Sequence, residues 1–170
     1  AKNNPKIEFD IYEKYLGVGC KPNYDLGYWV VMQHPVTTEI ELSKKHIEET
    51  LYAMRELNET VFWFWPNIDA GSDVTSNRIR AFREKFELKN FHFFKGMEPI
   101  DFLRILINSN GLIGNSSVGI RECAFLGIPA INIGNRQSGR MRGANVIDID
   151  YNKIDILKAV QKIKLKNHIM

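Results

Sequence analysis

Short apolar runs alternate with amphipathic stretches along most of this chain. The apolar runs have the length and the β-branched or aromatic content that are typical of buried strands. They cover residues 28–33, 61–65, 91–94, 111–114, 130–133 and 145–148. We therefore expect six strands in this part of the chain.

The stretches between these runs have the spacing of helices. In residues 42–57 the apolar side chains recur three or four positions apart among charged residues, as Ile47, Leu51 and Met54 show. Further helices are expected at 76–86, 99–107, 117–125 and 153–164. Strands that alternate with helices predict an α/β fold, with a Rossmann-like parallel sheet and helices on both faces.

The first 27 residues lack this regular alternation. A short helical stretch in KIEFDIYEKYLGV is followed by the turn-like segment KPNYDLG. We expect residues 1–27 to be a linker and residues 28–170 to form the Rossmann-like domain.

The composition fits a single globular domain. Of 170 residues, 44% are hydrophobic and 25% are charged, and the formal net charge is +3. That charge is too slight for the basic stripe expected of a nucleic-acid-binding protein. No apolar run approaches the roughly twenty residues of a membrane span. We expect neither a nucleic-acid nor a membrane partner.

The chain has two cysteines, Cys20 and Cys123. They are far apart and lack the spacing of a metal site or of a disulfide framework. We expect two reduced thiols in a cytoplasmic protein that needs no metal and no cofactor.

Ligands bind parallel α/β sheets beyond the carboxyl ends of the strands, so polar residues at those positions are the candidates. His34 follows the first strand, where it can donate to a phosphate or act as an acid or base. It can equally be a loop residue that bonds the backbone. Asn67 and Asp69 follow the second strand, where they can contact a sugar or a base, or form turns and caps.

A stronger signal follows the fourth strand, in the sequence GNSSVGIRE. The first N–H groups of a helix can hold a phosphate, and Ser116 and Ser117 can add their hydroxyls. Glu122, in the same predicted helix, can accept hydrogen bonds from ribose hydroxyls. The alternative is a serine that only caps the helix and a solvated Glu122. The motif is neither GxGxxG nor a Walker loop, which disfavours dinucleotide and ATP P-loop sites.

Three arginines follow the fifth strand. Arg136, Arg140 and Arg142 alternate with glycines within ten residues. One guanidinium group can donate two parallel hydrogen bonds to the oxygens of a phosphate. A basic loop that faces solvent is the alternative, but the neighbouring serines favour phosphate binding.

These segments together resemble a known family. HPVTTE, WPNIDAGSD, IGNSSVGIRECAFLGIPAINIGNRQSGR and ANVID, in this order and spacing, resemble the hydrolysing UDP-N-acetylglucosamine 2-epimerases. The resemblance implies a GT-B fold, in which two Rossmann-like halves enclose a nucleotide-sugar cleft. This chain looks like the C-terminal half, preceded in residues 1–27 by the linker and the tail of an N-terminal half.

The resemblance also implies a role for each candidate. His34 corresponds to a histidine near the diphosphate and C2 of the sugar, and would be catalytic. The two serines correspond to those that hold the UDP phosphates, and the glutamate to the one that holds the ribose. The implied UDP-binding residues are Asn67, Ser116, Ser117, Glu122 and Arg136.

The implied reaction has two steps. UDP leaves UDP-N-acetylglucosamine by elimination to give a 2-acetamidoglucal, and water then adds with inversion at C2 to release N-acetylmannosamine for sialic-acid-type sugars. The helix start, the hydroxyls and an arginine would stabilise the charge on the leaving diphosphate. The acid and base carboxylates of the family lie in its N-terminal half. We therefore expect this chain alone to bind UDP weakly without turnover, and the full-length enzyme to be a homo-oligomer.

Three other functions remain open. The enzyme can be a hydrolysing 2-epimerase for UDP-2,4-diacetamido-trideoxyglucose, because much of the sugar pocket belongs to the other half. It can be a GT-B glycosyltransferase, although the pairing of HPVTTE with GNRQSGR favours the epimerases. It can also be a non-catalytic module that binds a nucleotide sugar.

Overall fold

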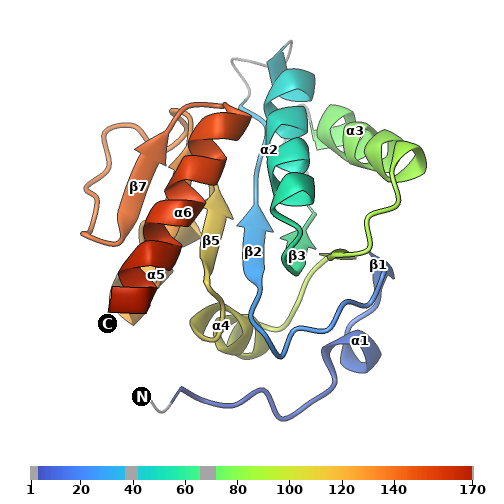
Figure 1. Ribbon diagram of the computed structural model, residues 1–170, viewed down its shortest axis with the longest axis horizontal. Coiled ribbons are helices and arrows are strands. Elements are labelled where there is room, and N and C mark those ends of the chain that lie inside the picture. The colour runs from blue at the N-terminus through green and yellow to red at the C-terminus, as the bar shows by residue number, and fades with distance from the viewer. Residues whose placement is uncertain (1–3, 37–41, 66–71, 170) are drawn as a thin grey trace.

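The computed structural model describes residues 4–36, 42–65 and 72–169, and these ranges contain one seven-stranded sheet (Figure 1). The strand order is β1-β4-β3-β2-β5-β6-β7, and every neighbouring pair is parallel except β1 with β4. The strands are β1 (Gly17–Gly19), β2 (Trp29–Met32), β3 (Val61–Phe64), β4 (Phe91–Phe94), β5 (Gly111–Gly114), β6 (Ala130–Ile133) and β7 (Val146–Ile149). The predicted α/β fold and its six parallel strands are confirmed.

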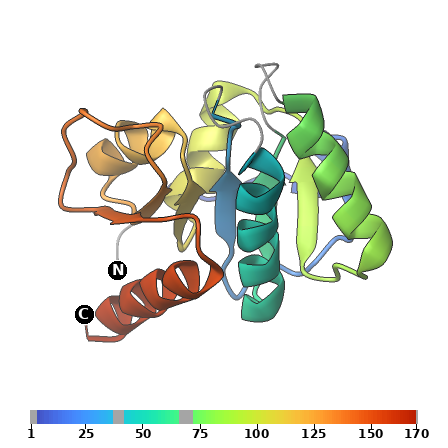
Figure 2. The same cartoon turned by 90° about the horizontal axis from the view of Figure 1, so that it is seen from above.

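Helices cover both faces of the sheet (Figures 1 and 2). They are α1 (Ile11–Lys14), α2 (Ser43–Leu57), α3 (Ser72–Lys85), α4 (Pro99–Ile107), α5 (Glu122–Leu126) and α6 (Lys153–Ile169). Side chains of α2, α3 and α6 share one buried cluster with the sheet, whereas those of α1, α4 and α5 share the other. This two-sided cover explains why the strands have continuous apolar sequences.

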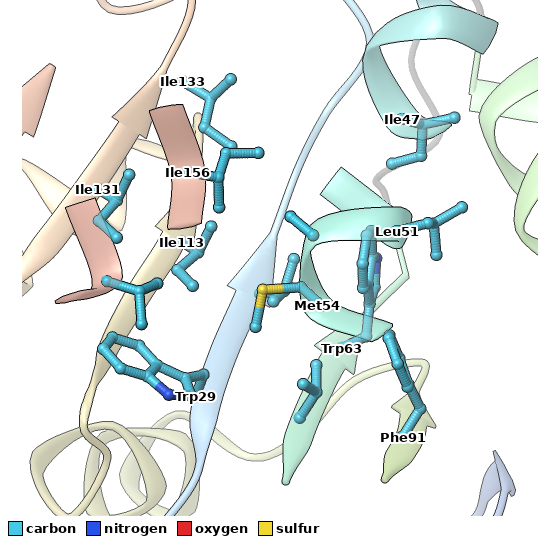
Figure 3. Close-up of a cluster of buried hydrophobic side chains, with 14 of the residues drawn as sticks. Trp29, Ile47, Leu51, Met54, Trp63, Phe91, Ile113, Ile131, Ile133 and Ile156 are labelled. Carbon is cyan, nitrogen blue, oxygen red and sulfur yellow. The ribbon is translucent and has the colours of Figure 1, made fainter. Parts of the chain in front are cut away.

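Alternate residues of each strand supply the two clusters. In β2, Trp29 and Val31 point toward α2 and α6, whereas Val30 points toward the opposite face. Figure 3 shows the first cluster, in which Trp63 and Phe91 from neighbouring strands lie with their ring centroids 6.3 Å apart. Burial of these large rings supplies much of the apolar surface that stabilises the sheet.

The N-terminal segment packs against the sheet. The short helix expected there is α1, whose Ile11 is fully buried beneath the face that α4 covers. The segment also contributes β1, which the sequence did not predict because Val18 is the one apolar side chain between two glycines. A Cβ on Gly17 would lie 2.5 Å from Nε2 of His92, so glycine is needed where β1 approaches β4.

One buried carboxylate ties α1 to α4. Asp101 of α4 has a side chain that is 3% exposed, and its Oδ2 lies 2.7 Å from the Lys14 ammonium. The Tyr15 hydroxyl donates to the same oxygen, and Arg104 lies 3.9 Å from the other one. The hydrogen bond from Lys14 is the main reason that the pKa of Asp101 is lowered below its ordinary value of 3.8.

The crossover after β5 differs from its prediction. A single helix at 117–125 was expected, but the structure has a short 3-10 turn at Ser117–Gly119, followed by α5. Gly119 packs tightly in that turn, since a Cβ would lie 3.1 Å from Leu112 of β5 and 3.3 Å from Ala130 of β6. The helix α5 ends at Gly127, which has a left-handed φ of 70° and an N–H that donates to the Ala124 carbonyl.

We predict that replacing Asp101 with Asn flattens the pH dependence of stability in acid. The folded-state pKa of Asp101 is lowered, so the contribution of its carboxylate is complete above pH 3.8 and is lost as the pH falls through the folded-state pKa. In urea denaturation at a series of pH values below 5, the free energy of unfolding of the D101N variant should therefore fall less with decreasing pH than that of the wild type. Asp25→Asn, at an exposed turn residue, controls for the loss of one negative charge. If the free energy of unfolding depends on pH equally in D101N and in the wild type, the stabilising role of the Asp101 carboxylate is disproved.

A second prediction concerns Gly114, the last residue of β5. Its φ is +143°, and a Cβ there would lie 1.9 Å from the Met32 carbonyl oxygen of β2. Gly114→Ala should lower the free energy of unfolding by more than about 3 kcal/mol, because the two strand ends must separate. Gly139→Ala is the matched control, since its φ is +81° but no atom lies within 4 Å of a Cβ. The control should cost only the conformational strain of about 1–2 kcal/mol, and denaturation curves that rank the two variants equally would refute the prediction.

Candidate functional site

The strand order reverses between β2 and β5, and the carboxyl ends of these two strands lie side by side. Trp29 to Met32 of β2 pair in register with Gly111 to Gly114 of β5. The crossovers from β2 and β5 leave toward opposite faces of the sheet, which opens a crevice at such a point. His34 and Ser116, each two residues beyond the end of its strand, are both candidates from the sequence.

Asn115 joins the two strand ends. Its side-chain Oδ1 accepts a hydrogen bond from the His34 N–H at 2.7 Å, and its Nδ2 donates to the His34 carbonyl at 2.8 Å. Asn115 is fully buried. The sequence analysis did not single it out, although it stands between Gly114 and the serine pair.

The two serines have different surroundings. Ser116 is 6% exposed, and its hydroxyl caps the 3-10 turn by accepting from the Val118 N–H at 3.3 Å. Ser116 therefore caps this turn with its oxygen, and the hydroxyl proton can still donate to another acceptor. Ser117 is half-buried as the first residue of that turn, so its N–H has no acceptor inside the turn. Because the turn has three residues, local N–H groups rather than a long helix dipole would attract an anion here.

Glu122 begins α5 and is half-buried. Its Oε2 is shielded from solvent and makes no hydrogen bond within the described ranges. A shielded carboxylate oxygen without a donor is costly. A ligand hydroxyl that donated to this oxygen would remove that cost, whereas the alternative of a fully solvated carboxylate does not fit this burial.

The three arginines after β6 divide into different roles. Nη1 of Arg136 donates to the Asn115 carbonyl at 3.2 Å, and the residue is otherwise exposed. Arg142 forms an ion pair with Asp148 at 3.1 Å, and its Nη1 donates to the carbonyls of Gln137 at 2.6 Å and Arg140 at 2.7 Å. Arg142 therefore shapes the loop that carries Arg136. Arg140 is exposed, and its backbone N–H bonds Gln137.

His34 is buried at the end of β2, with 7% of its surface exposed. It lines a small pocket with Ser43 and His46 of α2, Thr75 of α3, and Tyr151. The ring of Tyr151 stacks on His46 with centroids 3.5 Å apart. This pocket lies at the carboxyl end of β2, which is where a ligand of this fold is expected.

The structure thus links His34 and Arg136 through Asn115, and chain continuity places Ser116 and Ser117 next to it. Glu122 begins the following helix, and Asn67 lies outside the described residues.

Within 4–36, 42–65 and 72–169, no helix is long and apolar enough to cross a membrane. The same ranges hold no group of three His, Cys, Asp or Glu residues that could bind a metal.

Comparisons of the sequence with known proteins indicate one family. The profile described as "UDP-N-acetylglucosamine 2-epimerase" matches residues 10–169. The chain is 35% identical over 135 residues to the polysialic acid biosynthesis protein P7 of Escherichia coli, covering 78% of this chain and 34% of that protein. It is 32% identical over 136 residues to a UDP-N-acetylglucosamine 2-epimerase of Neisseria meningitidis, covering 80% of this chain and 35% of that protein.

A third relative acts on another sugar. The hydrolysing GDP/UDP-N,N'-diacetylbacillosamine 2-epimerase of Campylobacter jejuni is 30% identical over 157 residues, covering 91% of this chain and 40% of the relative. The chain therefore spans between about a third and two fifths of the length of these relatives.

The fold agrees with the sequence matches. The UDP-N-acetylglucosamine 2-epimerase of Methanocaldococcus jannaschii in complex with UDP-N-acetylglucosamine and UDP superposes with a TM-score of 0.63 at 13% identity, covering 81% of this chain and 38% of that one. Structural likeness at that identity shows the fold alone, but the family profile and the three relatives rest on sequence. This chain belongs to the UDP-N-acetylglucosamine 2-epimerase family.

Proposed function

We propose that this chain binds UDP at the joined ends of β2 and β5, as the nucleotide-binding half of a hydrolysing UDP-N-acetylglucosamine 2-epimerase. The observation that carries the proposal is the linkage of His34 and Arg136 through Asn115, next to the serine pair. A guanidinium and the N–H groups at the start of the 3-10 turn can stabilise the charge on a diphosphate leaving group, and a histidine beside it can donate or exchange a proton. Membership of the family supports UDP as the nucleotide.

Each candidate has a role in this proposal. The N–H and hydroxyl groups of Ser116 and Ser117 face the phosphates together with the free donors of Arg136. Glu122 accepts hydrogen bonds from the ribose hydroxyls through its shielded Oε2. Asn67 contacts the nucleotide, and His34 lies beside the diphosphate and C2 of the sugar.

The proposed reaction proceeds by elimination and then hydration. In the first step the proton leaves C2 and the bond from C1 to the diphosphate oxygen breaks, which gives 2-acetamidoglucal and UDP. In the second step water adds across the double bond and C2 receives its proton from the opposite face, which gives N-acetylmannosamine. Arg136 and the serine N–H groups stabilise the negative charge that develops on the diphosphate.

The chain spans at most 40% of the length of the three relatives described above. We propose that the remaining length of such proteins supplies the acid and base carboxylates and much of the sugar pocket, and that the complete enzyme works as a cytoplasmic homo-oligomer. The Campylobacter jejuni relative favours a second candidate, a hydrolysing 2-epimerase for a UDP-diacetamido sugar. Both candidates use the same nucleotide site.

We predict that isothermal titration calorimetry detects UDP binding to this chain and that Arg136→Ala weakens it at least about tenfold, since a charge-assisted hydrogen bond contributes about 1.5–3 kcal/mol. Glu122→Gln should weaken UDP binding as well, and should affect 2'-deoxy-UDP less because one ribose hydroxyl is gone. Arg55→Ala is the control, since Arg55 belongs to α2 and its guanidinium lies over the Phe86 ring. Equal affinities for the R136A variant and the wild type would refute the site.

A further prediction concerns turnover. The chain incubated with UDP-N-acetylglucosamine should release neither UDP nor N-acetylmannosamine in a coupled assay, because the proposed acid and base carboxylates lie in the remaining length of the relatives. Full-length enzyme should release both, and product analysis with the two candidate UDP-sugars decides between the two functions. Release of N-acetylmannosamine by the 170-residue chain would contradict the proposed division of roles.

A further inference from the structure

The side chain of Asn115 bonds both backbone groups of a single residue that lies just beyond another strand. Its amide accepts from the His34 N–H and donates to the His34 carbonyl, at 2.7 and 2.8 Å. The Asn115 N–H adds a third bond, to the Met32 carbonyl at 3.1 Å. The stretch just beyond β2 is therefore held in one place by a residue 81 positions away in the sequence.

An amide is the side chain that fits this position. It offers one acceptor and one donor on adjacent atoms, whereas a carboxylate offers acceptors only. Aspartate here would place an oxygen against the His34 carbonyl oxygen, and an apolar residue would leave the His34 N–H and carbonyl without these partners. Since Asn115 is fully buried, water cannot replace the lost bonds.

The backbone carbonyl of Asn115 organises a second part of the site. It accepts from Nη1 of Arg136 at 3.2 Å and from Nε2 of Gln137 at 3.0 Å. Arginine has five N–H donors, so this bond leaves most of the guanidinium available while it fixes the direction of the group. Gln137 is 3% exposed, and its own carbonyl is bonded by Arg142, so the loop end that carries Arg136 is held from two sides.

We propose that Asn115 is a positioning residue of the nucleotide site, which acts through His34 and Arg136 without touching the ligand. Its side chain sets the place of His34, and its carbonyl sets the direction of the Arg136 guanidinium. The inference rests on the proposed function, because it takes UDP as the ligand of this edge. A residue that only stabilised the fold would change the free energy of unfolding but would not be coupled to Arg136.

The test compares Asn115→Asp with a matched control. Asn90 allows the same substitution far from the site: it is a partly buried residue that directly precedes β4, and its Nδ2 donates to the carbonyls of Met54 at 3.3 Å and Glu59 at 2.8 Å. In calorimetric titrations of folded protein with UDP, N115D should weaken binding at least about tenfold and N90D by no more than about twofold. Equal losses in the two variants would overturn the proposal.

A double-mutant cycle tests the route of the effect. If Asn115 acts partly through Arg136, the N115D substitution should reduce UDP affinity by a clearly smaller factor in an R136A background than in the wild type. A purely structural role predicts the same factor in both backgrounds, and that result would also overturn the proposal. If N115D does not fold, Asn115→Ser replaces it in the same cycle, because serine keeps a hydroxyl that can donate.

A spectroscopic measurement separates this proposal from the proposed function. If the wild type binds no UDP, the proposed function fails, and the positioning role is then judged on the ligand-free chain. Nuclear magnetic resonance of the N115D variant should show shifted signals for the His34 backbone N–H and the Arg136 Nε–H, whereas N90D should shift neither. Unchanged signals in N115D would exclude the positioning role.

Discussion

The candidate site depends on how closely β5 approaches β2 at the point where the strand order reverses. That approach requires a residue without a side chain at position 114, because the Met32 carbonyl occupies the space where a Cβ would lie. The next residue then uses its amide as a substitute for backbone pairing. Two adjacent positions, a glycine and an asparagine, therefore convert a sheet contact into a fixed arrangement of functional groups.

Much of the fold could be predicted from the sequence, because the apolar runs mark strands that are buried on both faces. What the pattern missed was decided by contacts between distant residues. β1 has a single apolar side chain, Val18, and is a strand because β4 offers an unpaired edge. In place of the expected helix at 117–125 there is a 3-10 turn followed by α5, and Gly119 of that turn lies tightly against Leu112 and Ala130. Neither contact leaves a local signal.

The candidate site was predictable to a different extent. Position after a strand was enough to select His34, Ser116 and Arg136, since the carboxyl ends of parallel strands share one edge. The separate roles of the three arginines could not be predicted, because all three lie in one short Gly-containing segment and the sequence does not show which groups each of them contacts. Arg142 differs only through its ion pair with Asp148 and its bonds to the loop carbonyls. Asn115 was missed because its partner, His34, precedes it by 81 residues.

The short strand β1 has a consequence for self-association. Open sheet edges expose unpaired backbone groups that can recruit a strand from another molecule. Here that edge is a three-residue strand with glycine at both ends, drawn close to His92. Such a strand presents few backbone groups and little side-chain surface to an incoming chain, so it terminates the sheet and protects the aromatic strand β4 from intermolecular pairing.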